Sequence, residues 1–180
     1  MASFNFSMQP MYDPAAVQPM RDELTAVGFK ELLAPEEVDV ALSNHNDETT
    51  LLMINSVCGC AAGSARPGVT LALQHERIPD HFTTVFAGQD KAATEHARRT
   101  YLAEFPPSSP AMALLKNGKV LFMLHRRNIE GRSPEQIAGA LTKVFDQHCS
   151  RKGPALSPEQ YEKLVHAVTC GSKIPRFAEY

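Results

Sequence analysis

Apolar residues recur along much of the chain at a spacing of three or four positions, which predicts helices. From Val17 to Val27 this spacing predicts a helix over residues 14–27, and Gly28 suits the position just past its end. At residue 133 the letters SPEQ combine a capping box with a proline in the first turn, so a helix is predicted to begin there. The predicted helices cover residues 14–27, 34–44, 61–73, 91–102 and 133–149.

Other runs are continuously apolar or rich in β-branched residues, which predicts strands. Residues 49–57 (TTLLMINSV) are mostly apolar, as in a strand that is covered on both faces of a sheet. Residues 81–88 (HFTTVFAG) predict a second strand, and residues 29–33 (FKELL) a short one. The runs AMALLK and KVLFMLH flank Asn117-Gly118, which is the strongest hairpin signal in the chain.

The order of these elements predicts an α/β fold. Strands that are separated by helices pair in parallel after a crossover, whereas the hairpin adds antiparallel strands. We therefore expect a three-layer sandwich, with a mixed central sheet and helices on both faces. Residues 1–12 are polar and aperiodic and are expected to form an N-terminal arm, which leaves residues 13–149 for the α/β domain.

The remaining residues, 150–180, predict a C-terminal helical extension. Residues 150–156 (SRKGPAL) have the composition of a linker. A second SPEQ begins at Ser157, so another helix is expected to begin there. Apolar residues from Tyr161 to Val168 form one stripe, which predicts that this helix packs back on the domain.

Composition and charge exclude several classes of function. The chain has 180 residues, of which 43% are hydrophobic and 21% charged, and its formal net charge is −2. Because no block of Lys and Arg stands out, we expect neither nucleic acid nor an anionic membrane surface as a partner. The apolar runs are too short to span a bilayer, and the first residues lack the pattern of a secretory signal. A cytoplasmic protein is expected; its oligomeric state is not predicted.

The segment SVCGCAAG carries the candidate chemistry. Cys58 follows a predicted strand and precedes a predicted helix, so free N–H groups and the positive end of a helix dipole are expected beside it. Cysteines at such positions are more acidic than free cysteine and are nucleophilic at neutral pH. Gly59 lets the chain turn tightly, and Cys60 lies within reach of a disulfide on Cys58. This pattern predicts a redox pair, whose small-ring disulfide is expected to be strained and oxidising.

Two other interpretations of the cysteines remain open. Both thiols could be inert and buried, because free cysteine is among the most buried residue types. They could also begin a metal site, but Cys149 and Cys170 are isolated and no second pair at ligand spacing accompanies them, so no metal is expected. Four cysteines are too few for a disulfide framework, and Cys149 is expected to be structural.

Several segments together give the chain a marked resemblance to a known family. MRDELTAVGFKEL, INSVCGCAAGSARP, VFAGQDKAAT, PPSSPAMALLK and FDQHC resemble segments of the bacilliredoxins, over residues 11–149. These are small bacterial members of the thioredoxin superfamily with a Cys-Gly-Cys site. The resemblance implies a thioredoxin-like domain and a thiol–disulfide oxidoreductase that removes bacillithiol from S-bacillithiolated cytosolic proteins.

The resemblance also implies roles for individual residues. Cys58 would attack the mixed disulfide between protein and bacillithiol, and Cys60 or a second thiol would resolve it. The expected substrate-binding residues are Gly59, Arg66, Ser109 and Pro110. Ser109-Pro110 holds the place of the thioredoxin-like cis-proline, although the sequence does not fix the isomer. Bacillithiol would be a co-substrate, and no cofactor is expected.

Other residues have competing interpretations. Arg66 could steer the carboxylates of bacillithiol or could be a solvated surface residue. Arg126 and Arg127 are expected to be surface charges, and Asp90 is expected to cap a helix rather than to act in catalysis. Alternative functions are a protein disulfide isomerase or reductase with another thiol partner and, in a different class, a thiolate metal-binding module.

Overall fold

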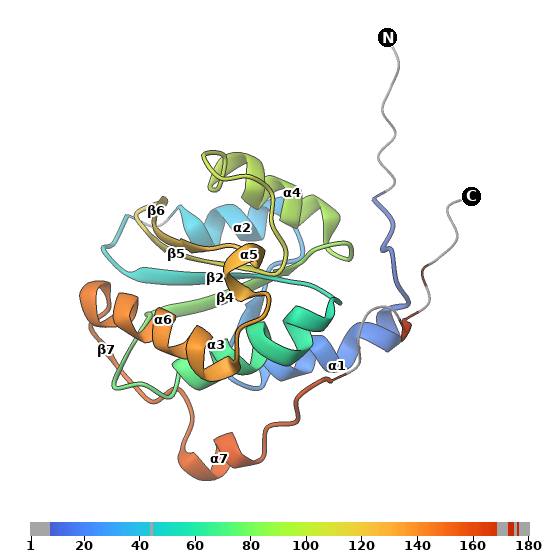
Figure 1. Ribbon diagram of the computed structural model, residues 1–180. Helices are drawn as coiled ribbons and strands as arrows, with labels where there is room; N and C mark the ends of the chain where they lie inside the picture. Colours follow the sequence, from blue (N-terminus) through green and yellow to red (C-terminus); the bar gives the residue numbers. More distant parts are fainter. Residues whose placement is uncertain (1–7, 44, 169–172, 175, 177–180) are drawn as a thin grey trace.

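The computed structural model describes residues 8–43, 45–168, 173, 174 and 176. A five-stranded sheet with the order β1-β4-β2-β5-β6 lies at its centre (Figure 1). β4 pairs in parallel with β1 and β2, whereas β5 is antiparallel to both β2 and β6. The strands of this sheet are β1 (Lys30–Glu31), β2 (Thr49–Asn55), β4 (His81–Phe86), β5 (Ala111–Lys116) and β6 (Lys119–Leu124).

Helices cover both faces of the sheet. In Figure 1, α2 and α4 lie on one face, and α1, α3 and α6 lie on the other. The predicted α/β three-layer sandwich, with a mixed central sheet and helices on both faces, is therefore confirmed. The helices are α1 (Pro14–Thr25), α2 (Pro35–Leu42), α3 (Arg66–Ala72), α4 (Lys91–Thr100), α5 (Arg126–Ile129), α6 (Pro134–His148) and α7 (Pro158–Glu162).

The central strand β2 is buried along its whole length, as its apolar sequence predicts. Successive side chains of a strand point to opposite faces of the sheet. Accordingly Leu51 and Met53 join the core under α1, α3 and α6, whereas Leu52 and Ile54 join the core under α2 and α4. With a core on each face, β2 holds the segment that follows it in a fixed place.

Local turn and cap signals are also confirmed. Asn117 and Gly118 adopt the positive φ angles of 52° and 72° that a two-residue hairpin needs between β5 and β6. Ser133 and Ser157 each begin a helix with a complete capping box. Asp13, a cap that was not predicted, begins α1 by accepting a hydrogen bond from the N–H of Ala15 at 2.9 Å.

The predicted helix over residues 61–73 begins with a π-helical turn. This turn, η1 (Ala61–Ala65), leads directly into α3, and the N–H of Arg66 donates to the carbonyl of Ala61. Pro67 has no N–H to donate to the preceding turn, so the α-helical bonding pattern cannot run unbroken through this point. The wider turn therefore lies between the cysteines and the regular part of the helix.

Residues 150–156, which have the composition of a linker, pair with the domain in the structure. β7 (Arg151–Lys152) pairs in antiparallel fashion with β3 (Arg77–Ile78), and the N–H of Ala155 donates to the carbonyl of Leu73 at 2.8 Å. Gly153 permits this packing, since a Cβ there would lie 2.0 Å from the carbonyl oxygen of His75. The glycine that makes this segment resemble a linker is therefore needed for a close backbone contact.

The predicted C-terminal helix begins where expected but ends before its apolar stripe does. α7 ends at Glu162, and two members of the predicted stripe are exposed, Val165 at 81% and Val168 at 82%. The capping box begins the helix, but β-branched valines continue it weakly. Beyond Leu164 the backbone instead bonds to side chains of α1 and α3 through Ala167.

A close contact between α3 and α6 gives a stability prediction. A Cβ at Gly68 would lie 2.7 Å from Cβ of Ile137 and 3.1 Å from the carbonyl oxygen of Pro134. Gly68→Ala is therefore expected to lower the free energy of unfolding by about 1–3 kcal/mol, as overpacking does. Chemical denaturation measures the change.

The matched control is Gly139→Ala, because Gly139 lies on α6 with nothing within 4 Å of a Cβ among the residues that the structure describes. This substitution is expected to stabilise the protein by about 0.5–1 kcal/mol through helix propensity. Equal effects of the two substitutions would contradict the close packing of α3 on α6.

Candidate active site

Cys58 lies where β2 ends and the next helix begins, as the sequence predicts. β2 ends at Asn55, and the helical conformation begins at Gly59. The N–H groups of Ala61 and Ala62 donate to the carbonyl of Cys58, and the N–H of Ala61 also lies 3.4 Å from Sγ of Cys58. An N–H at a helix N-terminus that points to sulfur stabilises a thiolate there.

The two thiols contact each other and are both free. Sγ of Cys58 lies 2.6 Å from Sγ of Cys60, and both residues are partly exposed. Three causes raise the pKa of Cys60 to about 11: burial, which is the largest, the hydrogen bond with Cys58, and the charge of Cys58. Cys60 is therefore a protonated thiol at neutral pH, able to donate its proton to the sulfur of Cys58.

This asymmetry predicts an order of modification by iodoacetamide. Between pH 7 and 8, peptide mapping is expected to show label on Cys58 and almost none on Cys60, because the thiolate is the reactive form. In a Cys58→Ser variant the charge of Cys58 is gone, so Cys60 is expected to be labelled at a lower pH than in the wild type, where its pKa is about 11. Preferential labelling of Cys60 at pH 7 would contradict the assignment.

Ser109 and Pro110 lie beside this turn. Ile54 of β2 pairs with Ala111 of β5, so Pro110 comes level with the end of β2, just before the cysteines. The Ser109-Pro110 peptide bond is cis, and Pro110 is buried. The structure thus brings four of the predicted site residues to one sheet edge, namely Cys58, Cys60, Ser109 and Pro110, and Gly59 lies between the cysteines.

Arg126 is exposed, as expected of a surface charge, and it also belongs to the same neighbourhood. The negative charges of Cys60 and Cys58 raise the pKa of Arg126, and its side chain is 48% exposed. Its N–H donates to Oγ of Ser108 at 2.8 Å, which ties α5 to the segment that precedes Pro110. The hairpin carries the signal for this placement: β6 runs parallel to β2, so Arg126 emerges at the same sheet edge as Cys58.

Arg66 does not lie where a bound substrate would be. Its side chain is fully buried, and Nε pairs with Oε2 of the equally buried Glu23 at 2.7 Å. The expectation that Arg66 steers the carboxylates of bacillithiol is therefore wrong, and so is the alternative of a solvated surface arginine. Arg66 lies in the helix predicted over residues 61–73, but its acidic partner on α1 was not predicted.

Arg66 instead supports the turn that leads to Cys58. Nη1 of Arg66 donates to the carbonyl of Ser56 at 3.0 Å and to Oδ1 of Asn55 at 3.2 Å. Oδ1 of Asn55 also accepts from the N–H of Ser56, and Oγ of Ser56 accepts from the N–H of Cys58 at 3.2 Å. Hydrogen bonds thus connect the buried ion pair to the backbone of Cys58.

Other candidates have structural roles. Asp90 stands at the N-cap position of α4, but its carboxylate accepts from the N–H of Phe86 and pairs with Arg21 at 2.7 Å. Cys149 is buried at the end of α6, and burial raises its pKa to about 11. Cys170 lies outside the described residues. In the described part of the chain, no group of three or more His, Cys, Asp or Glu side chains is arranged to hold a metal ion.

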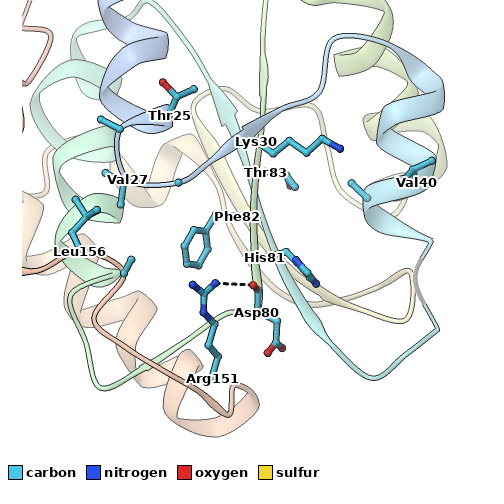
Figure 2. A pocket seen from close by; sticks show the side chains of 14 residues that line it. Thr25, Val27, Lys30, Val40, Asp80, His81, Phe82, Thr83, Arg151 and Leu156 are labelled. Atoms are coloured by element: carbon cyan, nitrogen blue, oxygen red, sulfur yellow. Dashed lines mark hydrogen bonds between the residues drawn. The ribbon is translucent and has the colours of Figure 1, made fainter.

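A pocket of about 550 Å³ lies at the opposite edge of the sheet from the cysteines. Figure 2 shows Phe82, His81 and Asp80 along its wall, at the amino end of β4, whereas Cys58 follows the carboxyl end of the parallel strand β2. Arg151 lies over the ring of Phe82 at 5.0 Å and donates to the carbonyl of Asp80 (Figure 2). This pocket is separate from the thiol chemistry.

Comparison with known proteins agrees with the geometry. The model of a family described as disulphide isomerase matches residues 12–149. A bacilliredoxin of Salinibacter ruber is 50% identical over 143 residues, which are 79% of this chain and 83% of that relative. A bacilliredoxin of Bacillus cereus is 45% identical over 149 residues, which are 83% of this chain and 98% of that relative.

The chain belongs to this family of bacilliredoxins. Among solved structures, an oxidised thioredoxin from Plasmodium falciparum is similar, with 15% identity, a TM-score of 0.44, and coverage of 68% of this chain and 100% of that one. As a bacilliredoxin with a Cys-Gly-Cys pair between a strand and a helix, the protein is a thiol–disulfide oxidoreductase. The helices of the described residues include none long and apolar enough to cross a membrane.

Proposed function

We propose that the protein removes bacillithiol from S-bacillithiolated cytosolic proteins. The Cys58 thiolate attacks the bacillithiol sulfur of the mixed disulfide, and the target leaves as a thiolate that takes up a proton. Cys60 then loses its proton and attacks the sulfur of Cys58, which releases reduced bacillithiol and forms the Cys58–Cys60 disulfide. A second thiol returns this disulfide to two thiols. The cytosol, where thiols are kept reduced, is the proposed location.

One observation carries the proposal: the sulfur of Cys58 accepts a backbone N–H and lies 2.6 Å from the sulfur of Cys60, which holds its proton at neutral pH. The N–H that the sulfur of Cys58 accepts belongs to Ala61. Cys58 is therefore suited to attack the mixed disulfide, and Cys60 is suited to resolve it in the next step. Thiol–disulfide exchange requires both roles, since a thiolate attacks and a second thiol resolves the mixed disulfide.

Arg126 supplies a charge that suits the proposed substrate. Its guanidinium lies close enough to the cysteines for their charges to raise its pKa. The carboxylates of bacillithiol bound at Cys58 would meet this charge. Arg126, and not Arg66, is therefore the residue proposed to attract the carboxylates of bacillithiol.

Arg126→Ala is therefore expected to slow the reaction with a bacillithiolated protein several-fold and to weaken its dependence on salt. The reaction with an uncharged disulfide is expected to slow much less, and stopped-flow rates at two ionic strengths measure both effects. Arg127→Ala, a change in the adjacent basic residue, is the matched control. Equal effects of the two substitutions would exclude a steering role.

The proposal is tested with purified components and intact-mass measurement. Reduced protein is mixed with the same target protein carrying either bacillithiol or glutathione as an adduct. The target is expected to lose bacillithiol faster than glutathione, while this protein gains one adduct or one internal disulfide. If the bacillithiol adduct stays on the target, the proposal fails.

The description of the matched family gives a second candidate, isomerisation of protein disulfides. In that case Cys58 would attack a disulfide within a protein, and the released thiol would reattack elsewhere. Recovery of activity by a scrambled disulfide-bonded protein tests this candidate. Faster turnover of scrambled protein disulfides than of bacillithiol adducts would favour it.

A further inference from the structure

The chain beyond the matched family domain returns to the active site. The family model ends at Cys149, and the relative from Bacillus cereus is covered over 98% of its length by an alignment that spans 83% of this chain. After α7 the chain turns back to α1 (Figure 1). We name three residues of this segment, His166, Ala167 and Ile174, the C-terminal clasp.

The clasp bonds to both members of the buried ion pair. The N–H of Ala167 donates to Oε2 of Glu23 at 3.1 Å, and Nη2 of Arg66 donates to the carbonyl of Ala167 at 2.8 Å. Nδ1 of His166 lies 2.6 Å from Oε1 of Glu23. Backbone and side chain of the clasp therefore complete the hydrogen bonding of two charged groups that are fully buried.

The clasp also belongs to the apolar cluster that contains the residue next to Cys58. Ala167 and Ile174 are 8% and 6% exposed, and they share a small apolar cluster with Val57 and Met20. Val57 directly precedes Cys58 in the chain. This shared cluster is a second connection between the clasp and the same turn, separate from the hydrogen bonds.

Clasp and catalytic turn are thus joined through Arg66. Nη2 of Arg66 donates to the carbonyl of Ala167 in the clasp. Nη1 donates to the carbonyl of Ser56 and to Oδ1 of Asn55 in the turn. Ser56 in turn accepts the N–H of Cys58. Undocking of the clasp would leave buried donors and acceptors of Arg66 and Glu23 without partners, which is costly enough to make the network rearrange.

We propose that the C-terminal clasp positions the turn at residues 56–58 through Arg66 and Glu23, so that docking of the clasp sets the reactivity of Cys58. The clasp residues touch no substrate and act by positioning. The inference rests on the proposed function in taking Cys58 as the attacking thiol. It adds a control element that lies outside the matched family domain.

Substitutions in the clasp test the proposal by the rate at which iodoacetamide alkylates Cys58 between pH 6 and 9. Ala167→Pro removes the N–H that Glu23 accepts, and His166→Ala removes only a partly exposed ring. Val165→Ala, in an exposed residue of the same segment, is the matched control.

Ala167→Pro is expected to slow alkylation by about 2- to 30-fold, the range for coupled sites, with a smaller effect from His166→Ala and none from Val165→Ala. Circular dichroism verifies that each variant is folded. Alkylation of all folded variants at the wild-type rate would overturn the proposal.

A second measurement uses the unsubstituted protein, so it decides the question even if Ala167→Pro does not fold. Coupling between two sites is reciprocal, so alkylation of Cys58 is expected to change hydrogen exchange at the amide of Ala167. Identical exchange before and after alkylation would overturn the proposal. Neither readout uses a disulfide substrate, so failure to remove bacillithiol would leave both results interpretable.

Discussion

Replacing Cys58 with serine is expected to abolish removal of the adduct, whereas replacing Cys60 with serine is expected to preserve the first step. A serine hydroxyl stays protonated at neutral pH and cannot displace a thiolate, so Cys58→Ser leaves only uncatalysed exchange. Cys60→Ser keeps the attacking sulfur but removes the resolving one, so the protein itself is expected to accumulate one adduct per chain. Intact masses of target and protein over time measure both effects.

Cys149→Ala is the control for this pair of variants. Cys149 is buried at the end of α6, near Thr49 at the opposite edge of the sheet from Cys58. This variant is expected to remove the adduct at the wild-type rate. If Cys58→Ser kept the first step and Cys60→Ser lost it, the roles of the two thiols would have to be exchanged.

The largest effect on stability is expected from Arg66→Met. Glu23 would remain buried without its arginine partner, keeping only the contacts from His166 and the N–H of Ala167, and breaking a buried ion pair in this way costs about 3–5 kcal/mol. For a chain of this size each kcal/mol corresponds to roughly 2–4 °C, so Tm is expected to fall by roughly 6–20 °C. Differential scanning calorimetry and urea denaturation measure the change.

Two comparisons show whether the buried pair is the cause. In Glu23→Gln/Arg66→Met the remaining charge is gone, so much of the lost stability is expected to return. Arg99→Met breaks an exposed pair, since the side chain of Arg99 is 79% exposed and that of Glu95 is 50% exposed. This substitution is expected to lower the free energy of unfolding by less than about 1 kcal/mol. Equal losses from Arg66→Met and Arg99→Met would contradict the account of the buried pair.

Sequence signals that are local to a few residues gave the fold and the place of the thiols. The apolar run of β2 predicts a strand buried on both faces, and Asn117-Gly118 predicts the hairpin. Cys58 then follows from chain order alone, because a strand end and a helix start bracket it. Each of these inferences depends on neighbours in sequence.

Hydrogen bonds and ion pairs between segments that are distant in sequence were not predicted. Arg66 was expected at a substrate or in solvent, because nothing near it in sequence reveals Glu23, which is 43 residues away. Ala167 contributes backbone groups, which leave no signature in side-chain chemistry. The position of Arg126 near the cysteines follows from the direction of β6. That direction could have been derived from the predicted hairpin.

The most direct test of the account maps the adduct during a single turnover. The Cys60→Ser variant is mixed with a bacillithiolated target and quenched with acid, and both proteins are digested without reductant. The account predicts that bacillithiol leaves the target and appears on the peptide that contains Cys58, in a ratio of one to one. Adduct that stays on the target, or that appears on Cys149 instead, would contradict it.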